Sequence, residues 1–314
     1  MRFNLCYDIA MKIVVTNNQD FTAEQKQRLD SLGDVMYYDT LPASGKEYLE
    51  RIKGADVICS GTAGLQDAYA QLKDVYITVA FVSVAFVDLE VLRNNNVTIS
   101  NAPGANRHAV SEWIMAMTTL LMRDLHSAIN RKETYRKDGN LPPITPGLAG
   151  NKMTILGQGN VGKRVGELAK TFGMEVTFFK RGDDMYAAAK NADVVVDTLS
   201  SNPSTRKLLD SKFFGAMKQG SYFVSVTRSE ITDEDALLNA LDEGKLAGAA
   251  SDCGGILVGD TEDSLYRKLL SHPKVLVTPH VSYNSEMSRK MGADIMIDNV
   301  EAWVSGNPQN VLNL

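Results

Sequence analysis

Residues 152–173 read KMTILGQGNVGKRVGELAKTFG, an apolar strand, a glycine-rich turn and a helix in succession. The turn, Gly157-Gln158-Gly159-Asn160-Val161-Gly162, satisfies the pattern G-x-G-x-x-G. Between a strand and a helix, the first glycine permits a tight turn, the second lets backbone approach a pyrophosphate, and the third lets the helix pack closely on the sheet. The helix N-terminus then directs its N–H groups at the phosphates. We expect dinucleotide binding here; a glycine turn without a ligand is the alternative.

The end of the next strand bears on which dinucleotide binds. The strand MEVTFF is followed by Lys180 and Arg181, where NAD-preferring folds usually place a carboxylate that binds the ribose 2′-hydroxyl. An ammonium and a guanidinium would instead bind a 2′-phosphate through charge-assisted hydrogen bonds. The sequence therefore favours NADP(H). NAD(H) is the alternative, with Asp183 or Asp184 binding the ribose.

Strand-like and helix-like segments alternate on both sides of this stretch. Upstream, KIVVT, TAEQKQRLDSLG, VMYYD, KEYLERIKGA and DVICSG follow one another from Lys12, and a second series runs from Lys152 to VLVTPH. Such alternation indicates βαβ units and parallel sheets. The apolar run 75–87 predicts one buried strand, and 109–123 predicts a long, largely buried helix. We predict an α/β fold with two Rossmann-like, doubly wound parallel-sheet domains.

Composition narrows the function classes. The 314 residues suit two domains, and a formal charge of -5 lacks the basic footprint that attracts nucleic acid or anionic lipid. No apolar run reaches the ~18 residues needed to cross a bilayer. Cys6, Cys59 and Cys253 show no metal or redox spacing, which favours free thiols in a reducing cytoplasm and no metal site. Residues 1–10 do not form a signal peptide. Because Met11 opens the strand-like KIVVT, we interpret these ten residues as a peripheral extension or an upstream start. A small-molecule substrate fits best.

Several separated motifs occur in an order that resembles the D-2-hydroxyacid dehydrogenase family. The resemblance runs from about Lys12 to the end, and the tail is most similar to glycerate dehydrogenases that reduce hydroxypyruvate. Its marks are NAPGANRHAVSE at 101–112, GQGNVG, NPSTRKLLD at 202–210, FVSVTRSEITDEDALLNAL at 223–241, GKLAGAASD at 244–252, VLVTPH at 275–280 and GNPQNVLN at 306–313.

The resemblance implies a domain plan and an activity. Residues 1–105 and 284–314 would form a discontinuous substrate domain, and 106–283 an NAD(P)-binding domain. The active site would lie in a cleft between them that closes by a hinge. It implies an oxidoreductase that transfers a hydride between NAD(P)H and a small 2-keto acid, with hydroxypyruvate or glyoxylate as candidate substrates. It also implies a homodimer.

Hydride transfer to a keto acid builds negative charge on the keto oxygen, so the site needs a fixed cation and a proton donor. Arg228 matches the family arginine, whose planar fork can hold carboxylate and keto oxygen together; a surface arginine after a strand is the alternative. His280 matches the family acid/base histidine. During reduction it would donate a proton to the nascent alkoxide, and during oxidation it would take that proton back.

The resemblance also assigns residues to the cofactor. Asp252 matches the family aspartate that accepts from the nicotinamide carboxamide; because Gly254 and Gly255 follow, a turn or cap aspartate is the alternative. The remaining matches would line the adenosine and nicotinamide pockets through their backbone: Ser200, Pro203, Thr205, Val226 and Thr227.

Two positions depart from the family pattern. The glutamate that pairs with the catalytic histidine is replaced by Leu257. Asp260, Glu262 or Asp263 could approach His280 from a rebuilt loop, and the sequence gives no reason to choose one of them. The glycines whose N–H groups bind the substrate carboxylate are replaced by Phe81, Val82 and Ser83, whose N–H groups could still donate while their side chains reshape the pocket. These losses favour a rival interpretation, a catalytically impaired NAD(P)H-binding sensor or scaffold of the same fold. Retention of Arg228 and His280 favours the enzyme.

Overall fold

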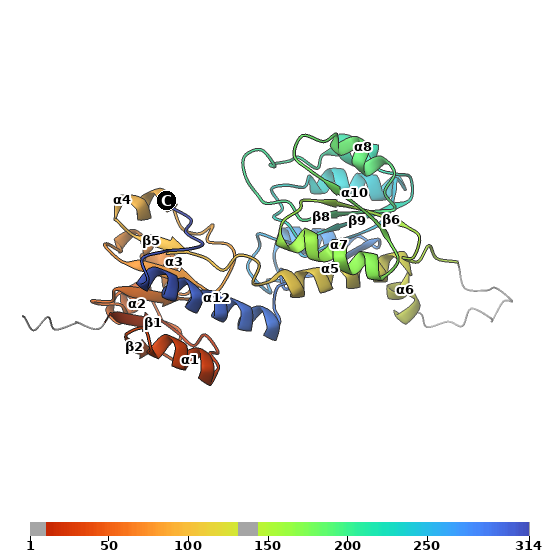
Figure 1. Ribbon diagram of the computed structural model, residues 1–314. Coiled ribbons are helices and arrows are strands. Elements are labelled where there is room, and N and C mark those ends of the chain that lie inside the picture. The colour runs from red at the N-terminus through yellow and green to blue at the C-terminus, as the bar shows by residue number, and fades with distance from the viewer. Residues whose placement is uncertain (1–10, 131–143, 314) are drawn as a thin grey trace, which may run out of the picture. The chain divides into compact units, whose positions relative to one another are not determined.

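The computed structural model describes residues 11–130 and 144–313. The segment 1–10, interpreted above as an extension, and Cys6 within it lie outside the described residues. The chain forms two compact units, one of Met1–Asn106 with Ser285–Leu314 and the other of Arg107–Asn284. Each holds a parallel sheet between helices, so the predicted α/β class with two parallel sheets is confirmed (Figure 1).

The first unit is built on a five-stranded sheet in the order β2-β1-β3-β4-β5, with every pair parallel. Its strands are short and mostly β-branched, which suits a sheet covered on both faces. Their bounds are β1 Lys12–Val15, β2 Asp34–Tyr37, β3 Val57–Ser60, β4 Tyr76–Val79 and β5 Thr98–Ser100.

Two layers of helices cover this sheet. One face packs against α1 and α12, and the other against α2, α3 and α4 with the short 3₁₀ helix η1. The alternation is visible in β1, where Ile13 and Val15 join the α12 side and Val14 joins the α2 side. The helix bounds are α1 Ala23–Asp30, α2 Gly45–Arg51, α3 Leu65–Ala68, η1 Tyr69–Gln71, α4 Leu89–Asn94 and α12 Glu286–Val304.

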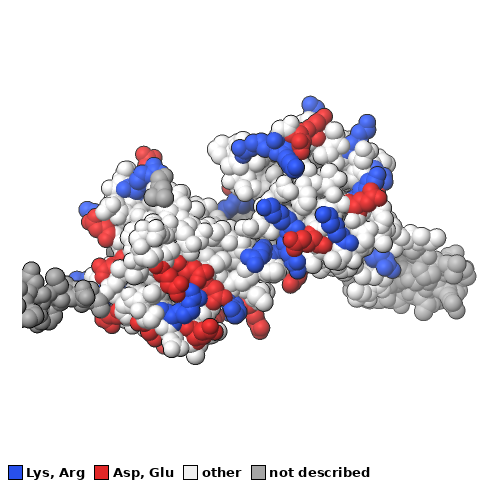
Figure 2. Space-filling view, viewed as in Figure 1, with Lys and Arg blue, Asp and Glu red and all other residues white. Residues whose placement is uncertain are grey.

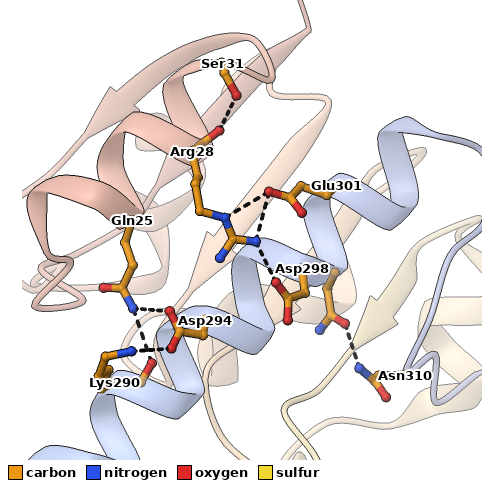
Figure 3. A network of polar contacts seen from close by, with 9 residues as sticks. Gln25, Arg28, Ser31, Lys290, Asp294, Asp298, Glu301 and Asn310 are labelled. Carbon is orange, nitrogen blue, oxygen red and sulfur yellow. Dashed lines mark hydrogen bonds and ion pairs between the residues drawn. The ribbon is translucent and has the colours of Figure 1, made fainter.

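Polar contacts tie α12 back to α1, so the last helix is built into the first unit (Figure 3). The Arg28 guanidinium lies 2.6 Å from an Asp298 oxygen and 2.9 Å from a Glu301 oxygen, and the Gln25 amide donates to Asp294 at 2.6 Å. Below this network Met296, Ile297 and Val300 are fully buried. Residues about 270 positions apart in the sequence therefore pack together in one unit.

The prediction of a single strand over 75–87 is wrong in its length. Strand β4 ends at Val79, opposite Ser60, the last residue of β3. Beyond that point neither neighbouring strand continues, so the backbone of 80–88 has no ladder to join and forms a loop. Val84 and Val87 remain apolar because they are buried in the core rather than paired in a sheet.

The second unit contains a six-stranded parallel sheet in the order β11-β10-β9-β8-β6-β7. The chain goes from β6 outward to β7 and then crosses to the other side of β6 with β8. That reversal is a topological switch point, where open α/β sheets bind ligands. The strand bounds are β6 Lys152–Leu156, β7 Glu175–Phe179, β8 Val194–Asp197, β9 Ser221–Ser225, β10 Leu246–Ser251 and β11 Val275–Val277.

Helices α5 and α7 cover one face of this sheet, and α8, α9, α10 and α11 cover the other (Figure 1). Val194 and Val196 of β8 face the first group, and Val195 faces the second. The helix predicted over 109–123 is α5. The bounds are α5 Arg107–Met122, α6 Leu125–Asn130, α7 Asn160–Thr171, α8 Met185–Lys190, α9 Ser211–Ala216, α10 Glu234–Asp242 and α11 Ser264–Leu270.

Charged side chains of both signs stand side by side over both units on the face drawn in Figure 2. Across the described parts of the chain, no helix has the length and apolar character that a membrane span requires. Cys59 and Cys253 are buried free thiols.

Candidate active site

The residues predicted for cofactor and catalysis in the second unit all follow strand ends at one edge of the sheet. The glycine turn follows β6, Lys180 follows β7, Thr227 and Arg228 follow β9, Asp252 follows β10 and His280 lies just past β11. Because all six strands are parallel, their carboxyl ends share one edge. This edge is where Rossmann-type sheets carry their ligands.

The glycine turn is packed tightly at its first and third glycines and open at its second. Gly157 has φ +102°, and a Cβ there would lie 2.9 Å from the Thr198 carbonyl oxygen. A Cβ on Gly162 would lie 2.1 Å from the Gly157 carbonyl oxygen, whereas a Cβ on Gly159 would meet nothing within 4 Å. Gly159 is also the N-cap of α7, and no side chain caps that helix. The uncapped N–H groups and the open space over Gly159 suit a pyrophosphate.

The turn after β7 keeps its two carboxylates occupied. The Asp183 carboxylate accepts from the Lys180 backbone N–H at 2.8 Å. Asp184 is the N-cap of α8 and accepts from the N–H groups of Tyr186 and Ala187. The side chains of Lys180 and Arg181 are exposed, and within the described chain neither forms an ion pair. The cations are therefore available to an anion, and the carboxylates are engaged by the local backbone.

A buried carboxylate that sequence reasoning missed lies between β8 and β9. Asp197 ends β8 with no solvent exposure. It accepts from the Thr227 hydroxyl at 2.6 Å, the Ser225 hydroxyl at 3.2 Å and the Leu199 N–H at 3.0 Å. Burial raises the pKa of Asp197 to about 6, against the lowering effect of these three donors. Asp197 thus fixes Thr227, the residue before Arg228.

The loop after β8 closes on itself through side chains. The Thr205 hydroxyl donates to the Ser200 carbonyl oxygen at 2.9 Å, and the Asn202 N–H donates to the Thr205 hydroxyl oxygen at 3.0 Å. Pro203 lies within this loop. Val226 donates its N–H to the Asp197 carbonyl oxygen at 3.4 Å, which anchors the residues that follow β9.

Arg228 is half-buried, and its backbone is held by the neighbouring loop. It forms a parallel bridge with Gly254, whose carbonyl oxygen also accepts from the Ser229 N–H at 2.9 Å. A Cβ on Gly254 would lie only 2.4 Å from the Thr227 carbonyl oxygen, so only glycine permits this approach. The backbone of Arg228 is therefore set by the segment that follows Asp252.

His280 is held at three points in a strained conformation. Its φ of +54° is left-handed, which is uncommon for a residue other than glycine and occurs often at functional sites. Its N–H lies 3.0 Å from the Asp252 carbonyl oxygen, and its Nδ1 lies 3.1 Å from the Ile256 carbonyl oxygen. The ring also packs edge-on against Tyr283, with 5.7 Å between centroids. The Ile256 carbonyl is a partner that side-chain patterns could not reveal.

Asp252 is 1% exposed, and its carboxylate binds the segment that carries His280. It accepts from the Thr278 hydroxyl, from the Val281 N–H at 2.9 Å and from the Ser282 N–H at 2.8 Å. The three donors come from residues 278–282, so the Asp252 carboxylate fixes the position of this segment.

The carboxylates considered as replacements for the family glutamate are engaged elsewhere. Asp260 accepts from the N–H groups of Glu262 and Asp263, Asp263 caps α11, and Glu262 pairs with Arg267. Leu257 itself is 78% exposed. None of the three carboxylates therefore binds His280.

The predicted substrate loop lies in the first unit, directly after β4. The Ala102 N–H donates to the Phe81 carbonyl oxygen at 3.0 Å, and the Asn101 amide donates to the Val82 carbonyl oxygen at 2.5 Å. Among the described residues, the N–H groups of Phe81 and Val82 have no acceptor. Val82 and Ser83 are exposed. The carbonyls of Phe81 and Val82 are thus fixed, while the N–H groups of the same two residues remain available.

Across the described residues, no group of three or more His, Cys, Asp or Glu side chains could hold a metal ion. The glycine turn, the switch point and the polar edge define a dinucleotide-binding α/β protein.

Comparisons with known proteins specify the class further. The family model for the D-isomer specific 2-hydroxyacid dehydrogenase NAD-binding domain matches residues 115–282, more than half of the chain. The chain therefore belongs to the D-isomer specific 2-hydroxyacid dehydrogenase family, and the predicted family is confirmed.

Curated and solved relatives agree with this assignment. A glycerate dehydrogenase from Methylorubrum extorquens is 28% identical over 280 residues, covering 85% of this chain and 88% of that protein. A solved D-2-hydroxyisocaproate dehydrogenase matches with a TM-score of 0.76 at 21% identity, covering 97% of this chain and all of the other. A glyoxylate reductase from Paecilomyes thermophila matches with a TM-score of 0.77 at 20% identity, covering 96% and 98%. At these identities the two structures show the fold alone.

Proposed function

We propose that the chain reduces a small 2-keto acid with NADPH, with Arg228 as the substrate-binding cation and His280 as the acid/base. The observation that carries this proposal is that one segment, 252–256, holds both residues. Gly254 bridges the backbone of Arg228, while the carbonyl oxygens of Asp252 and Ile256 bind the N–H and Nδ1 of His280. The unit Arg107–Asn284 is then the cofactor unit, and the other unit supplies Phe81, Val82 and Ser83 to the substrate.

The chain's residues divide the work of the reaction. When bound, the nicotinamide supplies or accepts the hydride. The Arg228 guanidinium holds the substrate carboxylate and stabilises charge that grows on the keto oxygen. His280 Nε2 donates a proton to that oxygen during reduction and takes it back during oxidation. The N–H groups of Phe81 and Val82 add donors for the carboxylate.

The preference for NADPH is supported by the turn after β7. Lys180 and Arg181 offer two cations to a 2′-phosphate, and Asp183 and Asp184 are engaged by backbone N–H groups. Hydrogen bonds to charged groups contribute about 1.5–3 kcal/mol each. Lys180→Ala with Arg181→Ala should raise the KM for NADPH by about tenfold or more and leave the KM for NADH nearly unchanged. An equal loss for both cofactors would contradict a phosphate site.

The first test is the loss of absorbance at the reduced-nicotinamide band, with NADPH and NADH in parallel. Hydroxypyruvate and glyoxylate are the proposed substrates, and pyruvate is the comparison. Arg228→Ala should lower kcat/KM by about 10²–10³-fold, the effect of losing one preorganised charge-stabilising donor. Its affinity for NADPH should not change.

A second outcome would support the sensor or scaffold instead. If no keto acid is turned over while NADPH still binds by fluorescence, the chain binds cofactor without catalysis. Turnover with NADH alone would retain the enzyme and exclude the NADPH preference. From the family resemblance we further propose a cytoplasmic homodimer, and sedimentation of the purified protein would test the dimer.

A further inference from the structure

We propose that Asp252 and the main-chain carbonyl of Ile256 are the positioning groups of His280. Together they hold the imidazole as its Nδ1–H tautomer and leave Nε2 as the atom that gains and loses the proton. The assignment of the tautomer rests on geometry, and only its catalytic consequence rests on the function proposed above. Among the described residues the ring nitrogen Nδ1 is bound by a main-chain carbonyl, and the Asp252 carboxylate acts on the ring only through the backbone of residues 278–282.

The tautomer follows from the partner of Nδ1. A carbonyl oxygen can only accept a hydrogen bond, so the 3.1 Å contact with Ile256 requires the hydrogen to be on Nδ1 of His280. A neutral imidazole carries one N–H, and Nε2 therefore presents its lone pair. The hydrogen bond to Ile256 and the edge-on contact with Tyr283 together fix the plane of the His280 ring. The hydrogen bond that one ring nitrogen makes decides which nitrogen reacts.

Asp252 fixes the backbone on which the ring is mounted. Its carboxylate takes three donors from residues 278–282, and its own carbonyl oxygen accepts from the His280 N–H. Four hydrogen bonds to one residue hold His280 in its left-handed conformation, which would otherwise be costly. With 1% exposure, the carboxylate is engaged within the protein.

The segment between the two positioning groups is itself constrained. Cys253 and Gly255 have φ of +40° and +110°, and Gly254 is bridged to Arg228 and to Ile256. The Gly259 N–H then donates to the Pro279 carbonyl oxygen at 2.8 Å, next to His280. The segment leaves Asp252, turns sharply and returns to the histidine. The Ile256 carbonyl reaches Nδ1 because of this path.

A neutral acceptor differs chemically from the family carboxylate. A carbonyl orients the ring and selects the tautomer, but it offers an imidazolium less stabilisation than an ionised carboxylate would. Leu257 cannot compensate, because its side chain is apolar and 78% exposed. The Asp252 carboxylate binds Thr278, Val281 and Ser282, so it acts on His280 through the backbone.

The test is nitrogen NMR of the full-length protein at a pH where the imidazole is neutral, with His280 assigned by comparison with His280→Gln. We expect the Nδ1–H tautomer in the wild type. In Asp252→Asn, one acceptor oxygen and an NH₂ group replace the carboxylate, so the ring should show mixed tautomers. The kcat/KM should fall about 10–100-fold, the range for losing a positioning partner, while the Kd for NADPH stays within twofold. An Nε2–H tautomer in the wild type would overturn the proposal.

Matched variants keep the outcome interpretable. Thr278→Val removes one donor to Asp252 and should shift the tautomer ratio in the same direction by less, which matters if Asp252→Asn fails to fold. Leu257→Ala changes the same loop and should leave the tautomer unchanged. A tenfold weaker Kd for NADPH in Asp252→Asn with the tautomer intact would make Asp252 a cofactor ligand and refute its positioning role. Because the tautomer is read without substrate, a failure to turn over keto acids would refute the proposed function separately.

Discussion

Asp197 is a carboxyl group enclosed at the end of β8, and its ionisation opposes folding. Burial raises its pKa from 3.8 to about 6. A raised pKa means that the folded state holds the proton more tightly, so the associated stability is present below pH 3.8 and is lost as the pH rises through 6. At 1.36 kcal/mol per pKa unit, the full cost is about 3 kcal/mol above neutrality.

Asp197→Asn removes this titration. Relative to the wild type, the variant's free energy of unfolding should rise by about 2–3 kcal/mol between pH 4 and pH 7, and denaturant unfolding at a series of pH values would measure it. The lost acceptor for Thr227 or Ser225 shifts the whole curve by a constant, so only the slope bears on the prediction. Parallel curves for the two proteins would show that folded Asp197 is already ionised at pH 4 and that burial does not raise its pKa.

The same residues show what sequence can reveal at this scale. Arg228 and His280 follow recognisable strand ends, so their placement at the sheet edge could be predicted. Asp197 has a visible signal, a carboxylate at the end of the apolar run DVVVD. The Ile256 carbonyl had none, because every residue carries such a group and only the turn at Cys253 and Gly255 brings this one to Nδ1. Positioning by main chain depends on tertiary structure.

At the scale of the element, the β6–α7 turn separates two uses of glycine. Gly162→Ala would place a Cβ 2.1 Å from backbone, so the strand and helix must move apart. We expect a loss of about 2 kcal/mol or more, the cost of overpacking. Gly159→Ala meets open space and has an accessible φ of -76°, so its stability should change by less than about 1 kcal/mol.

Cofactor binding should be weakened in Gly159→Ala, although the stability of this variant is nearly unchanged. The Cβ at residue 159 would occupy the space that suits a pyrophosphate, so Gly159→Ala should weaken NADPH binding at least tenfold while melting like the wild type. Calorimetric melting and fluorescence titration of both variants give the comparison. Unchanged affinity in Gly159→Ala would place the phosphates elsewhere.

Element lengths are less accessible to sequence than element identities. The strand–turn–helix at 152–173 was predictable because each glycine has a local conformational reason. The run 75–87 was not, since β4 ends where β3 and β5 end and the remaining apolar residues are buried in a loop. Apolar runs report burial, and pairing partners set where a strand stops.

At the scale of the whole molecule, the first unit depends on the last helix in the chain. Helix α12 buries Met296, Ile297 and Val300 completely against β1, β3 and β4, and its Asn299 amide donates to Thr78 and to the Asn101 carbonyl oxygen. Burying each apolar side chain contributes about 1.5–3 kcal/mol. The three together approach the 5–15 kcal/mol that is typical of a whole domain.

A chain that ends at residue 284 should therefore lose the fold of its first unit and keep that of its second. The sheet face lined by Ile13, Val15 and Val57 would be exposed to water, whereas Arg107–Asn284 keeps its own two cores. Limited proteolysis should leave a resistant fragment that begins near Arg107, and this fragment should still bind NADPH by fluorescence.

Arg28→Ala in the full chain is the control for this truncation. It removes only the partly exposed ion pairs with Asp298 and Glu301, so the free energy of unfolding should fall by about 1 kcal/mol or less. If the truncated chain resists proteolysis across residues 11–106, the first unit folds without α12, and its core is then completed by the strands and the remaining helices alone.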